Sequence, residues 1–385
     1  MLVQEDFYPL IPKASFMKKL YLIMIAGFFA ILGSTMSKSP TLPLYAQSLG
    51  LTKGEIGLVA SASTVTGILV NFVSGILSDI YGRKKLLKLS GFVFFSAPLL
   101  YFLAKDALVL ALVRAYYGIA TAIFVPVSLA LISDIFPEKK GTFMGLLSSS
   151  TLVGRALAPL LAGTLIYFVD FWIVFLLCSF FGSIVFALTF TFPETGKDLE
   201  KFKFSFSSDL LLLGILDASV YMAYQSIETF LPLFYFLEGE AWLSGLILTV
   251  EISIMAIVKP YAGYLSDKIG RVKPIIFGMG LVSSAMFIFA FSKSLPLVIF
   301  GAVLFSLGAS ISEASTKPLA TEISKLKGTA LGFLESIKDV GQALGPIIVG
   351  FFGFKLGFTF VGVFGASALG AFILKFKSIK AEKLP

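Results

Sequence analysis

The chain alternates between long apolar stretches and short charged turns over almost its whole length. Each apolar stretch approaches or exceeds the roughly 20 residues that an α-helix needs to cross the hydrocarbon core of a bilayer. The pattern predicts an all-α membrane protein with twelve transmembrane helices. The predicted spans are residues 18–38, 56–78, 86–104, 107–131, 142–167, 171–192, 209–236, 242–260, 274–292, 295–317, 328–350 and 356–376.

Composition leaves no room for a sizeable soluble domain. Of the 385 residues, 57% are hydrophobic and only 14% are charged, whereas soluble domains carry about 25% charged residues. The single long hydrophilic stretch divides the chain into two halves. We therefore predict a cytoplasmic segment 1–16, a six-helix bundle 17–192, a cytoplasmic linker 193–208, a second six-helix bundle 209–376 and a cytoplasmic tail 377–385.

Two patterns recur once in each half. The motif Gly-x-x-x-Asp-x-x-Gly-Arg-x-Lys occupies residues 75–85 and returns at 263–273. A second set of small residues and proline is repeated at an offset of 187 residues, with Gly145, Gly154, Pro159 and Gly163 returning as Gly332, Gly341, Pro346 and Gly350. Internal duplication in a multi-span chain is typical of secondary transporters, whose substrate site lies between the repeats. The repeats therefore predict two pseudo-symmetric bundles around a central site.

The net charge of +8 reflects membrane topology. If both termini are cytoplasmic, 22 lysines and arginines, Lys259 among them, fall on the cytoplasmic side and only four on the outside. This asymmetry follows the positive-inside rule. It predicts a multi-pass protein of the cytoplasmic membrane rather than a nucleic-acid-binding protein.

Several classes of chemistry lack the residues that they need. The chain has no histidine and a single cysteine, Cys178, which predicts neither a disulfide nor a metal site. It has no Gly-x-x-x-x-Gly-Lys-Ser/Thr motif for ATP and no Gly-x-Ser-x-Gly motif for hydrolysis. We expect a protein that is not an enzyme, uses no cofactor or ATP, and carries protons on carboxylates.

The repeated loop predicts a conformational lock. Gly75 and Gly82 permit a tight turn, and the charge of Asp79 can be neutralised by a nearby arginine or by the N-terminus of a neighbouring helix. Arg83 can pair with Asp134, and Asp267, Gly270, Arg271 and Glu322 take the equivalent places in the second half. The lock would favour the outward-facing state. The alternative is a loop whose positive charges only set topology.

These features together resemble the major facilitator superfamily along nearly the whole chain. The resemblance rests on the repeated loop, the doubled spans, Pro193-Glu194-Thr195 and the Arg114-x-x-x-Gly118 pattern. Residues 145–163 also resemble the signature of its drug/proton antiporter branch, although Ala158 and Ala162 stand where that signature has glycine. Generic packing of small residues is the alternative interpretation of that segment. The resemblance implies a central cavity lined by the spans 18–38, 107–131, 209–236 and 295–317.

Ionisable residues inside spans are the best candidates for the site, because an uncompensated charge in the bilayer is costly. Burial disfavours the charged form of a carboxyl group, so that it can take up and release protons near neutral pH. For proton coupling we predict Glu228 with Asp217 or Glu313 as its partner, and Arg114 as the group that tunes them. For Glu313, a simple helical ion pair with Lys317 is the alternative.

A second set of residues is predicted to contact the substrate. Tyrosine rings on the cavity-type spans can stack on aromatic or cationic compounds, although outward packing against lipid is the alternative for each. Lys38 can instead extend to the membrane surface. The predicted cavity residues are Lys38, Tyr116, Tyr117, Tyr221, Tyr224, Gln225 and Lys317.

A third set is predicted to join the two bundles. Arg155 and Glu251 lie mid-span in helices that abut across the halves of this fold, which predicts an ion pair that breaks during transport. Glu335 and Asp339 share one face with Lys338 and can meet the Asp79 loop or form a self-neutralised cluster. Pro159, which would bend its helix, and Pro346, its counterpart in the repeat, belong to the same predicted set.

These features favour proton-coupled efflux of small amphipathic or drug-like compounds by alternating access. We expect a monomer to be sufficient, because one chain contains both bundles. The alternative is a proton-coupled carrier of organic anions, because Lys38, Arg114 and Arg155 give the first half a positive wall.

Overall fold

In the computed structural model, residues 14–51, 53–196, 207–236, 241–292 and 294–381 are described, and their regular structure is entirely helical. The short 3-10 turn η1 is Tyr101–Leu103. The α-helices are α1 Ala14–Lys38, α2 Thr41–Ser48, α3 Lys53–Tyr81, α4 Arg83–Leu100, α5 Ala107–Ile135, α6 Lys140–Phe168, α7 Phe171–Thr189, α8 Ser208–Phe236, α9 Ala241–Ile269, α10 Val272–Phe291, α11 Leu295–Ile323 and α12 Lys327–Ala381.

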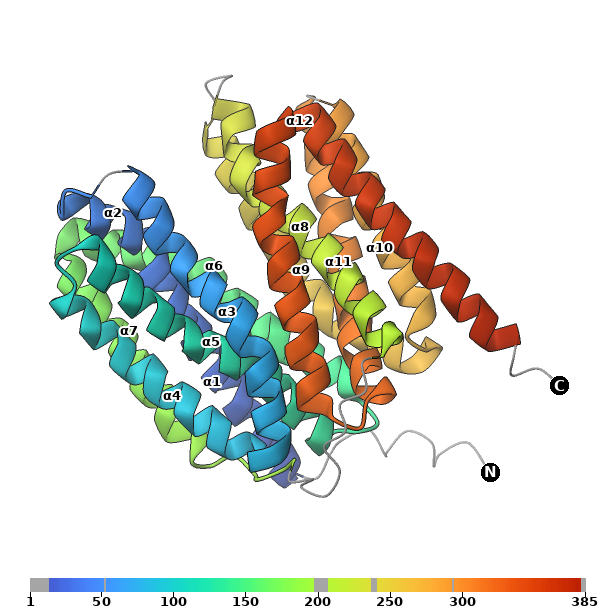
Figure 1. The fold of residues 1–385 in the computed structure, drawn as a ribbon, viewed down its shortest axis with the longest axis horizontal. Coiled ribbons are helices and arrows are strands. Elements are labelled where there is room, and N and C mark those ends of the chain that lie inside the picture. Colours follow the sequence, from blue (N-terminus) through green and yellow to red (C-terminus); the bar gives the residue numbers. More distant parts are fainter. Residues whose placement is uncertain (1–13, 52, 197–206, 237–240, 293, 382–385) are drawn as a thin grey trace, which may run out of the picture.

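The twelve predicted spans are confirmed. Eleven helical segments among the described residues are long and apolar enough to cross a membrane. The last of them, α12, consists of two helices that meet at Gly353, where φ is 76°. Figure 1 shows its first part rising through the molecule and its second part returning along the outside. The short helix α2 extends the first span and was not predicted separately.

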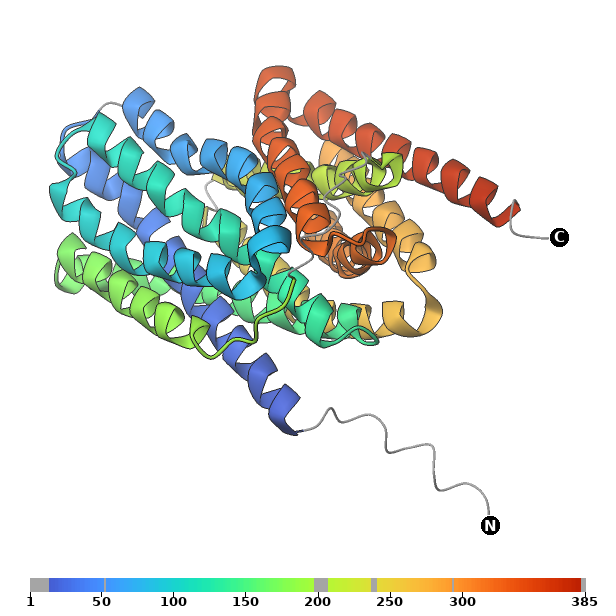
Figure 2. The ribbon, with the colours of Figure 1, turned by 60° about the horizontal axis from the view of Figure 1, so that its bottom comes forward.

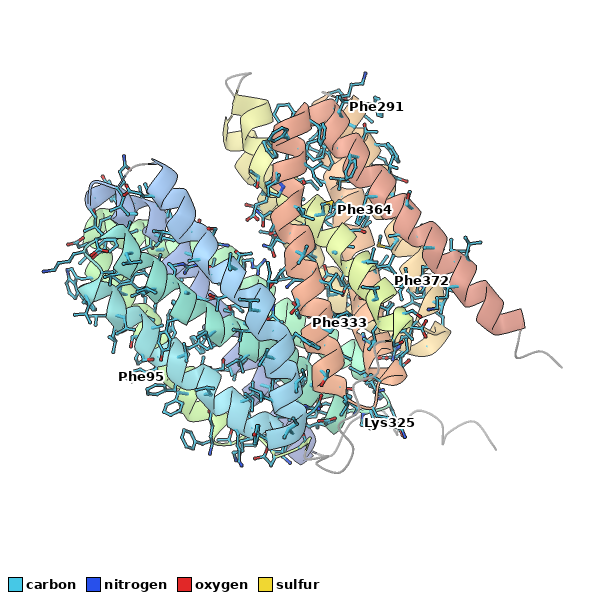
Figure 3. The ribbon with its side chains drawn as sticks, in the orientation of Figure 1. Phe95, Phe291, Lys325, Phe333, Phe364 and Phe372 are labelled. Carbon is cyan, nitrogen blue, oxygen red and sulfur yellow. The ribbon has the colours of Figure 1, made fainter. Side chains whose placement is uncertain are left out.

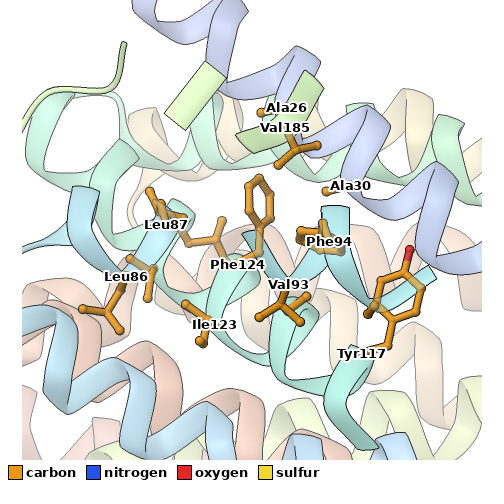
Figure 4. Packing of buried hydrophobic residues seen from close by; sticks show 14 of the residues in the cluster. Ala26, Ala30, Leu86, Leu87, Val93, Phe94, Tyr117, Ile123, Phe124 and Val185 are labelled. Carbon is orange, nitrogen blue, oxygen red and sulfur yellow. The ribbon is translucent and has the colours of Figure 1, made fainter. Parts of the chain in front are cut away.

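The helices form two bundles, α1–α7 and α8–α12, which stand side by side (Figures 1 and 2). Each has its own buried core. In the first, the Phe94 ring packs edge-on against Phe124 and Tyr117 (Figure 4). In the second, Tyr224 stacks on Phe305. The two cores meet at the interface, where Leu331 of α12 joins the first core and Phe72 of α3 packs against the second.

The outer surface is apolar. Tyr167, Phe168 and Phe351 expose 83%, 75% and 87% of their surface, and Figure 3 shows Phe291 at the outside of the second bundle. In water such a surface would be unfavourable, whereas lipid tails accept it without cost. The fold is therefore that of a multi-pass membrane protein.

The bundles contact each other mainly through two helix pairs, α3 with α12 and α6 with α9. Glycines permit the close approach: Gly75 lies against the backbone of Gly328, and Gly263 lies against that of Gly141. All four positions fall at the same end of the molecule, which we call the closed end. At the other, open end the bundles diverge (Figure 1).

The predicted domain boundaries are only partly covered. Residues 1–13 and 197–206, which hold most of the predicted first segment and linker, and residues 382–385 of the predicted tail lie outside the described residues.

Candidate functional site

A cavity of about 430 Å³ lies between the two bundles. It begins beside Lys38 and Ser39 near the open end and reaches down to Asn71 and Glu335, beyond which the bundles touch. Of the predicted site residues, it is lined by Lys38, Arg114, Tyr117, Arg155, Pro159, Gln225, Glu228, Glu335 and Asp339.

The wall formed by the first bundle is basic. Arg114 on α5 is 4% exposed and donates to the Ser63 hydroxyl at 2.8 Å and to the Tyr101 hydroxyl at 3.4 Å. Lys38 is exposed and lies within electrostatic range of Arg114 and Arg155. No ion pair found among the described residues includes any of these three cations. Among the described residues, the hydrogen bonds of Arg114 go to hydroxyl groups, and its predicted tuning role stays a prediction.

The facing wall carries Glu228 on α8. Its carboxylate is exposed and accepts a hydrogen bond from the Gln225 amide at 3.0 Å. Gln342 on α12 donates in turn to Gln225 at 2.9 Å. Glu228 also lies within electrostatic range of Lys38 and Arg155. A proton or a ligand that enters from the open end can therefore reach Glu228 directly.

Below Glu228, the first part of α12 contributes a charge cluster. Glu335 pairs with Lys317 of α11 at 2.8 Å and with Lys338, and Lys338 pairs with Asp339 at 3.2 Å. Asp339 accepts a hydrogen bond from Asn71 of the first bundle at 2.7 Å. Of the two predicted alternatives, the structure contains the self-neutralised cluster. Of these two acids, Asp339 joins the bundles directly, whereas Glu335 is compensated within its own bundle.

Asp217 and Glu313 lie outside the lining of the large cavity, Asp217 on α8 and Glu313 where α11 faces α6 of the first bundle. Asp217 is 1% exposed and accepts from the Thr316 hydroxyl at 2.7 Å. Glu313 is 3% exposed and pairs with Lys259 at 2.8 Å, not with Lys317. Glu313, Lys259 and Lys317 border a separate cavity of about 10 Å³, roughly the space of one water molecule.

Lys259 corrects an assumption about topology. The charge count placed it at the cytoplasmic surface, but it is 5% exposed and its ammonium group is bound to Glu313. Its position eight residues before Asp267 puts it two turns inside the span. Sequence reasoning missed this pair because its partners are 54 residues apart on different helices.

Other predicted residues point elsewhere. The hydroxyl groups of Tyr116 and Ser96 form a hydrogen bond at 2.9 Å. The ring of Tyr221 packs against the Lys338 ammonium group, with 4.7 Å between the nitrogen and the ring centre. Five of the predicted residues do not line the large cavity: Tyr116, Tyr221, Tyr224, Lys317 and Pro346.

The predicted ion pair between Arg155 and Glu251 does not form in this structure. Arg155 lines the cavity near Tyr224, Tyr221 and Glu228. The Glu251 side chain is 1% exposed, and within the described part of the chain both of its oxygens lack a hydrogen-bond partner. The arginine faces the aqueous cavity while the acid is enclosed, so the two groups are kept apart.

The closed end is sealed by the repeated loop. The Asp79 carboxylate accepts from the backbone amides of Gly328 at 3.1 Å and Thr329 at 2.6 Å, and from the Thr329 hydroxyl at 2.6 Å. These groups form the N-terminus of α12, where the helix dipole favours an anion. Arg83 pairs with Asp79 at 2.6 Å and with Asp134 at 3.3 Å. Asp79 thus joins the two bundles.

The second loop repeats this arrangement on the other side. Asp267 accepts from the amides of Gly141 at 3.1 Å and Thr142 at 2.9 Å, and from the Thr142 hydroxyl at 2.7 Å. Arg271 pairs with Asp267 at 2.6 Å and with Glu322 at 3.0 Å. Gly82 and Gly270 occupy the turns, with φ of 96° and 85°.

Sequence reasoning did not identify which helix termini meet these aspartates, although a signal was present. Both termini begin with Lys-Gly-Thr, at residues 140–142 and 327–329. The two lysines extend the seal: Lys327 pairs with Asp134 at 2.8 Å, and Lys140 approaches Glu322 at 4.0 Å. The tripeptide returns after 187 residues, the same offset as the glycine and proline repeat. This repetition was a signal in the sequence for the helix termini that bind Asp79 and Asp267.

Comparison with known proteins is consistent with this architecture. The family model of the Major Facilitator Superfamily matches residues 23–250 and 243–384. The chain belongs to the Major Facilitator Superfamily. The family and the fold are those of transporters of small molecules, and the repeated loop is the part of this facilitator that closes its cavity at one end.

Among curated relatives, an uncharacterised MFS-type transporter of Methanocaldococcus jannaschii is 27% identical over 368 residues, which cover 91% of this chain and 95% of that protein. The multidrug resistance protein MdtG of Proteus mirabilis is 27% identical over 382 residues, covering 92% and 94%. The human organic anion transporter MFSD10 has the same fold, with a TM-score of 0.78 at 16% identity, covering 94% of this chain and all of that one.

Proposed function

We propose that this facilitator is a secondary active transporter of the cytoplasmic membrane, with both termini in the cytoplasm, that exports small amphipathic compounds in exchange for protons. The cavity between the bundles carries the proposal. It is open at one end, sealed at the other, and lined by charges from both bundles. Similarity to MdtG multidrug resistance proteins supports efflux.

In this proposal the sealed end is cytoplasmic. It carries Lys84, Lys85 and Lys273 next to the two loops, as the positive-inside rule requires. The described conformation is then outward-facing, the state in which an exporter releases its substrate and takes up a proton.

Glu228 is the proposed proton acceptor in this state. It is exposed in the cavity and has one amide donor, so that water and ligand can reach it. A cationic ligand would be held while Glu228 is ionised and released on protonation, because the cavity then loses one negative charge. Asp217 and Glu313 are buried deeper and become proposed partners for the inward-facing state.

The second candidate is a carrier of organic anions. It is favoured by the basic wall, where Lys38, Arg114 and Arg155 line the cavity without an ion-pair partner among the described residues. Three such cations face one exposed carboxylate, Glu228, since the α12 cluster is self-neutralised. A carboxylate or phosphonate group would find complementary charge there.

The test is proton flux in proteoliposomes of the purified protein, read with an internal pH dye. Lipophilic cations, neutral amphiphiles and organic anions are added one at a time. Export of cations predicts that a lipophilic cation moves protons and that Glu228→Gln reduces the flux about 100-fold, the lower end of the range for a positioned acid–base group. Lys38→Met should leave that flux largely intact.

The opposite pattern supports the anion carrier. In that case only anions move protons, and Lys38→Met or Arg155→Met weakens their transport. If no compound of any class moves protons with the wild-type protein, the proton-coupled proposal is wrong.

A further inference from the structure

We propose that Asp339 is a proton-sensitive latch between the cavity and the closed end. While its carboxylate is ionised it holds α12 against α3, and its neutralisation by a proton favours opening of the closed end. This inference rests on the proposed alternating access. It assigns to Asp339 a positioning role distinct from that of Glu228, which faces the open end.

The geometry of Asp339 suits a latch. Its Oδ2 atom accepts the 2.7 Å hydrogen bond from the Asn71 amide, which crosses from one bundle to the other. Gly67 lies one turn from Asn71 on α3, and a Cβ atom at that position would be 2.9 Å from Oδ2. The carboxylate therefore fills a notch that the absent side chain of Gly67 leaves in α3.

The latch touches both the cavity and the seal. Asn71, Gly67 and Asp339 all line the large cavity, so water and protons can reach the bond. The same two helices form the seal, where Thr329 of α12 binds Asp79 of α3. Asp339 lies about 15 Å further along α12 than Thr329, at 1.5 Å per residue. The helices α3 and α12 are therefore joined at two points, Asp79–Thr329 and Asn71–Asp339. Loss of the bond at Asp339 leaves the pair held at the other point alone.

The surrounding charges determine what a proton does there. Lys338 and Glu335 are the charged neighbours of Asp339 on α12. Lys317 of α11 forms an ion pair with Glu335, and Lys38 of α1 lies within electrostatic range of Asp339. Tyr221 of α8 lies under Lys338, and Asn71, which does not titrate, faces Asp339 from α3.

With Asp339 ionised, the cluster Lys317, Lys338, Glu335 and Asp339 is neutral. A proton from the cavity water that binds to the Asp339 carboxylate leaves the cluster with one positive charge. The ion pair with Lys338 is lost, and the bond from Asn71 becomes one between neutral groups, about half as strong as the charged one.

The experiment measures opening of the closed end without substrate. Lys85 and Lys273 are exposed, pseudo-symmetric positions on α4 and α10. Cys178, the single cysteine of the chain, is replaced by alanine, and spin labels are placed at Lys85→Cys and Lys273→Cys in lipid nanodiscs. The distance distribution is recorded at about pH 8 and about pH 5.5. We expect acid to increase the population at longer distance.

Asp339→Asn should raise the long-distance population at both pH values, by roughly tenfold in the open-to-closed ratio at pH 8, and should flatten the response to acid. Gly67→Ala keeps every charge but places a methyl group against Oδ2. It should raise the long-distance population at pH 8 as well. Asp106→Asn, at the N-terminus of α5 near the open end, is the matched control and should behave as the wild type.

Wild-type populations in both Asp339→Asn and Gly67→Ala would overturn the latch. So would an acid response that survives Asp339→Asn and disappears only in Glu228→Gln. Because the distances need no substrate, a protein that shows the latch but moves no protons in proteoliposomes would contradict the proposed function alone.

Discussion

Lys259 shows how single buried charges are compensated in this molecule. It lies inside a membrane span, and its ammonium group is held by Glu313 at 2.8 Å. Removing one partner of such a pair leaves an uncompensated charge, which costs far more than removing both. The same reasoning applies to Lys317 and Glu335. Glu251 differs, because neither of its oxygens has a hydrogen-bond partner among the residues that the structure describes.

The pair can be tested by a double-mutant cycle. Lys259→Met leaves Glu313 without its ion-pair partner, although the Tyr221 hydroxyl still donates to it at 3.4 Å. The change should destabilise the protein by about 3 kcal/mol, the lower end of the range for a broken buried pair, because the acid can neutralise itself by taking up a proton. Lys259→Met combined with Glu313→Gln should recover more than half of the loss. The stability of the single and the double variant is measured by heating each in detergent and recording the remaining folded fraction by size-exclusion chromatography. A double variant no more stable than the single one would show that Glu313 does not need Lys259.

At the scale of helices, the contacts between the bundles depend on glycine. Gly75 of α3 and Gly263 of α9 occupy equivalent positions in the repeat, and each lies against the backbone of a glycine in the opposite bundle. No larger residue fits while the helices keep this distance. Gly280 of α10, by contrast, has no atom within 4 Å of where a Cβ would stand.

This difference gives a matched pair of substitutions. Gly263→Ala should force α6 and α9 apart and increase the accessibility of a cysteine placed near the closed end, such as Lys273→Cys, to a water-soluble maleimide. Gly280→Ala should leave accessibility unchanged and stabilise the helix by about 0.5–1 kcal/mol, the ordinary gain for glycine to alanine. Equal labelling in the two variants would mean that the closed end does not depend on this contact.

For the whole molecule, the sequence predicted the architecture and the seal better than the cavity. Twelve spans and two bundles follow from apolar run lengths and repeats, which are local properties of the chain. The partners Arg83 and Asp134 followed from the repeated motif. The pairs Lys259–Glu313, Lys317–Glu335 and Asn71–Asp339 did not, since the rotation of each helix decides which face meets which neighbour.

The cavity lining illustrates the same limit. The resemblance implied that α1, α5, α8 and α11 surround it, but the described lining includes α3, α6, α9 and α12 and no residue of α11. Glu313 and Lys317 consequently lie outside that lining and border the small cavity beside α6 instead. Which helices border a cavity depends on how far the two bundles are tilted, and that depends on the conformational state as well as on the sequence.

The central claim is that the two bundles rock about the cavity, so that one end opens as the other closes. The most direct measurement is a pair of spin-label distances, one across the closed end at Lys85→Cys and Lys273→Cys, and one across the open end at Lys105→Cys and Lys355→Cys. All four positions are exposed. Each pair is compared in the wild type and in Asp79→Asn combined with Asp267→Asn, which weakens both caps at once. The account predicts a longer distance at the closed end together with a shorter one at the open end. A longer closed-end distance with an unchanged or longer open-end distance would contradict it, because the molecule would then open as a pore.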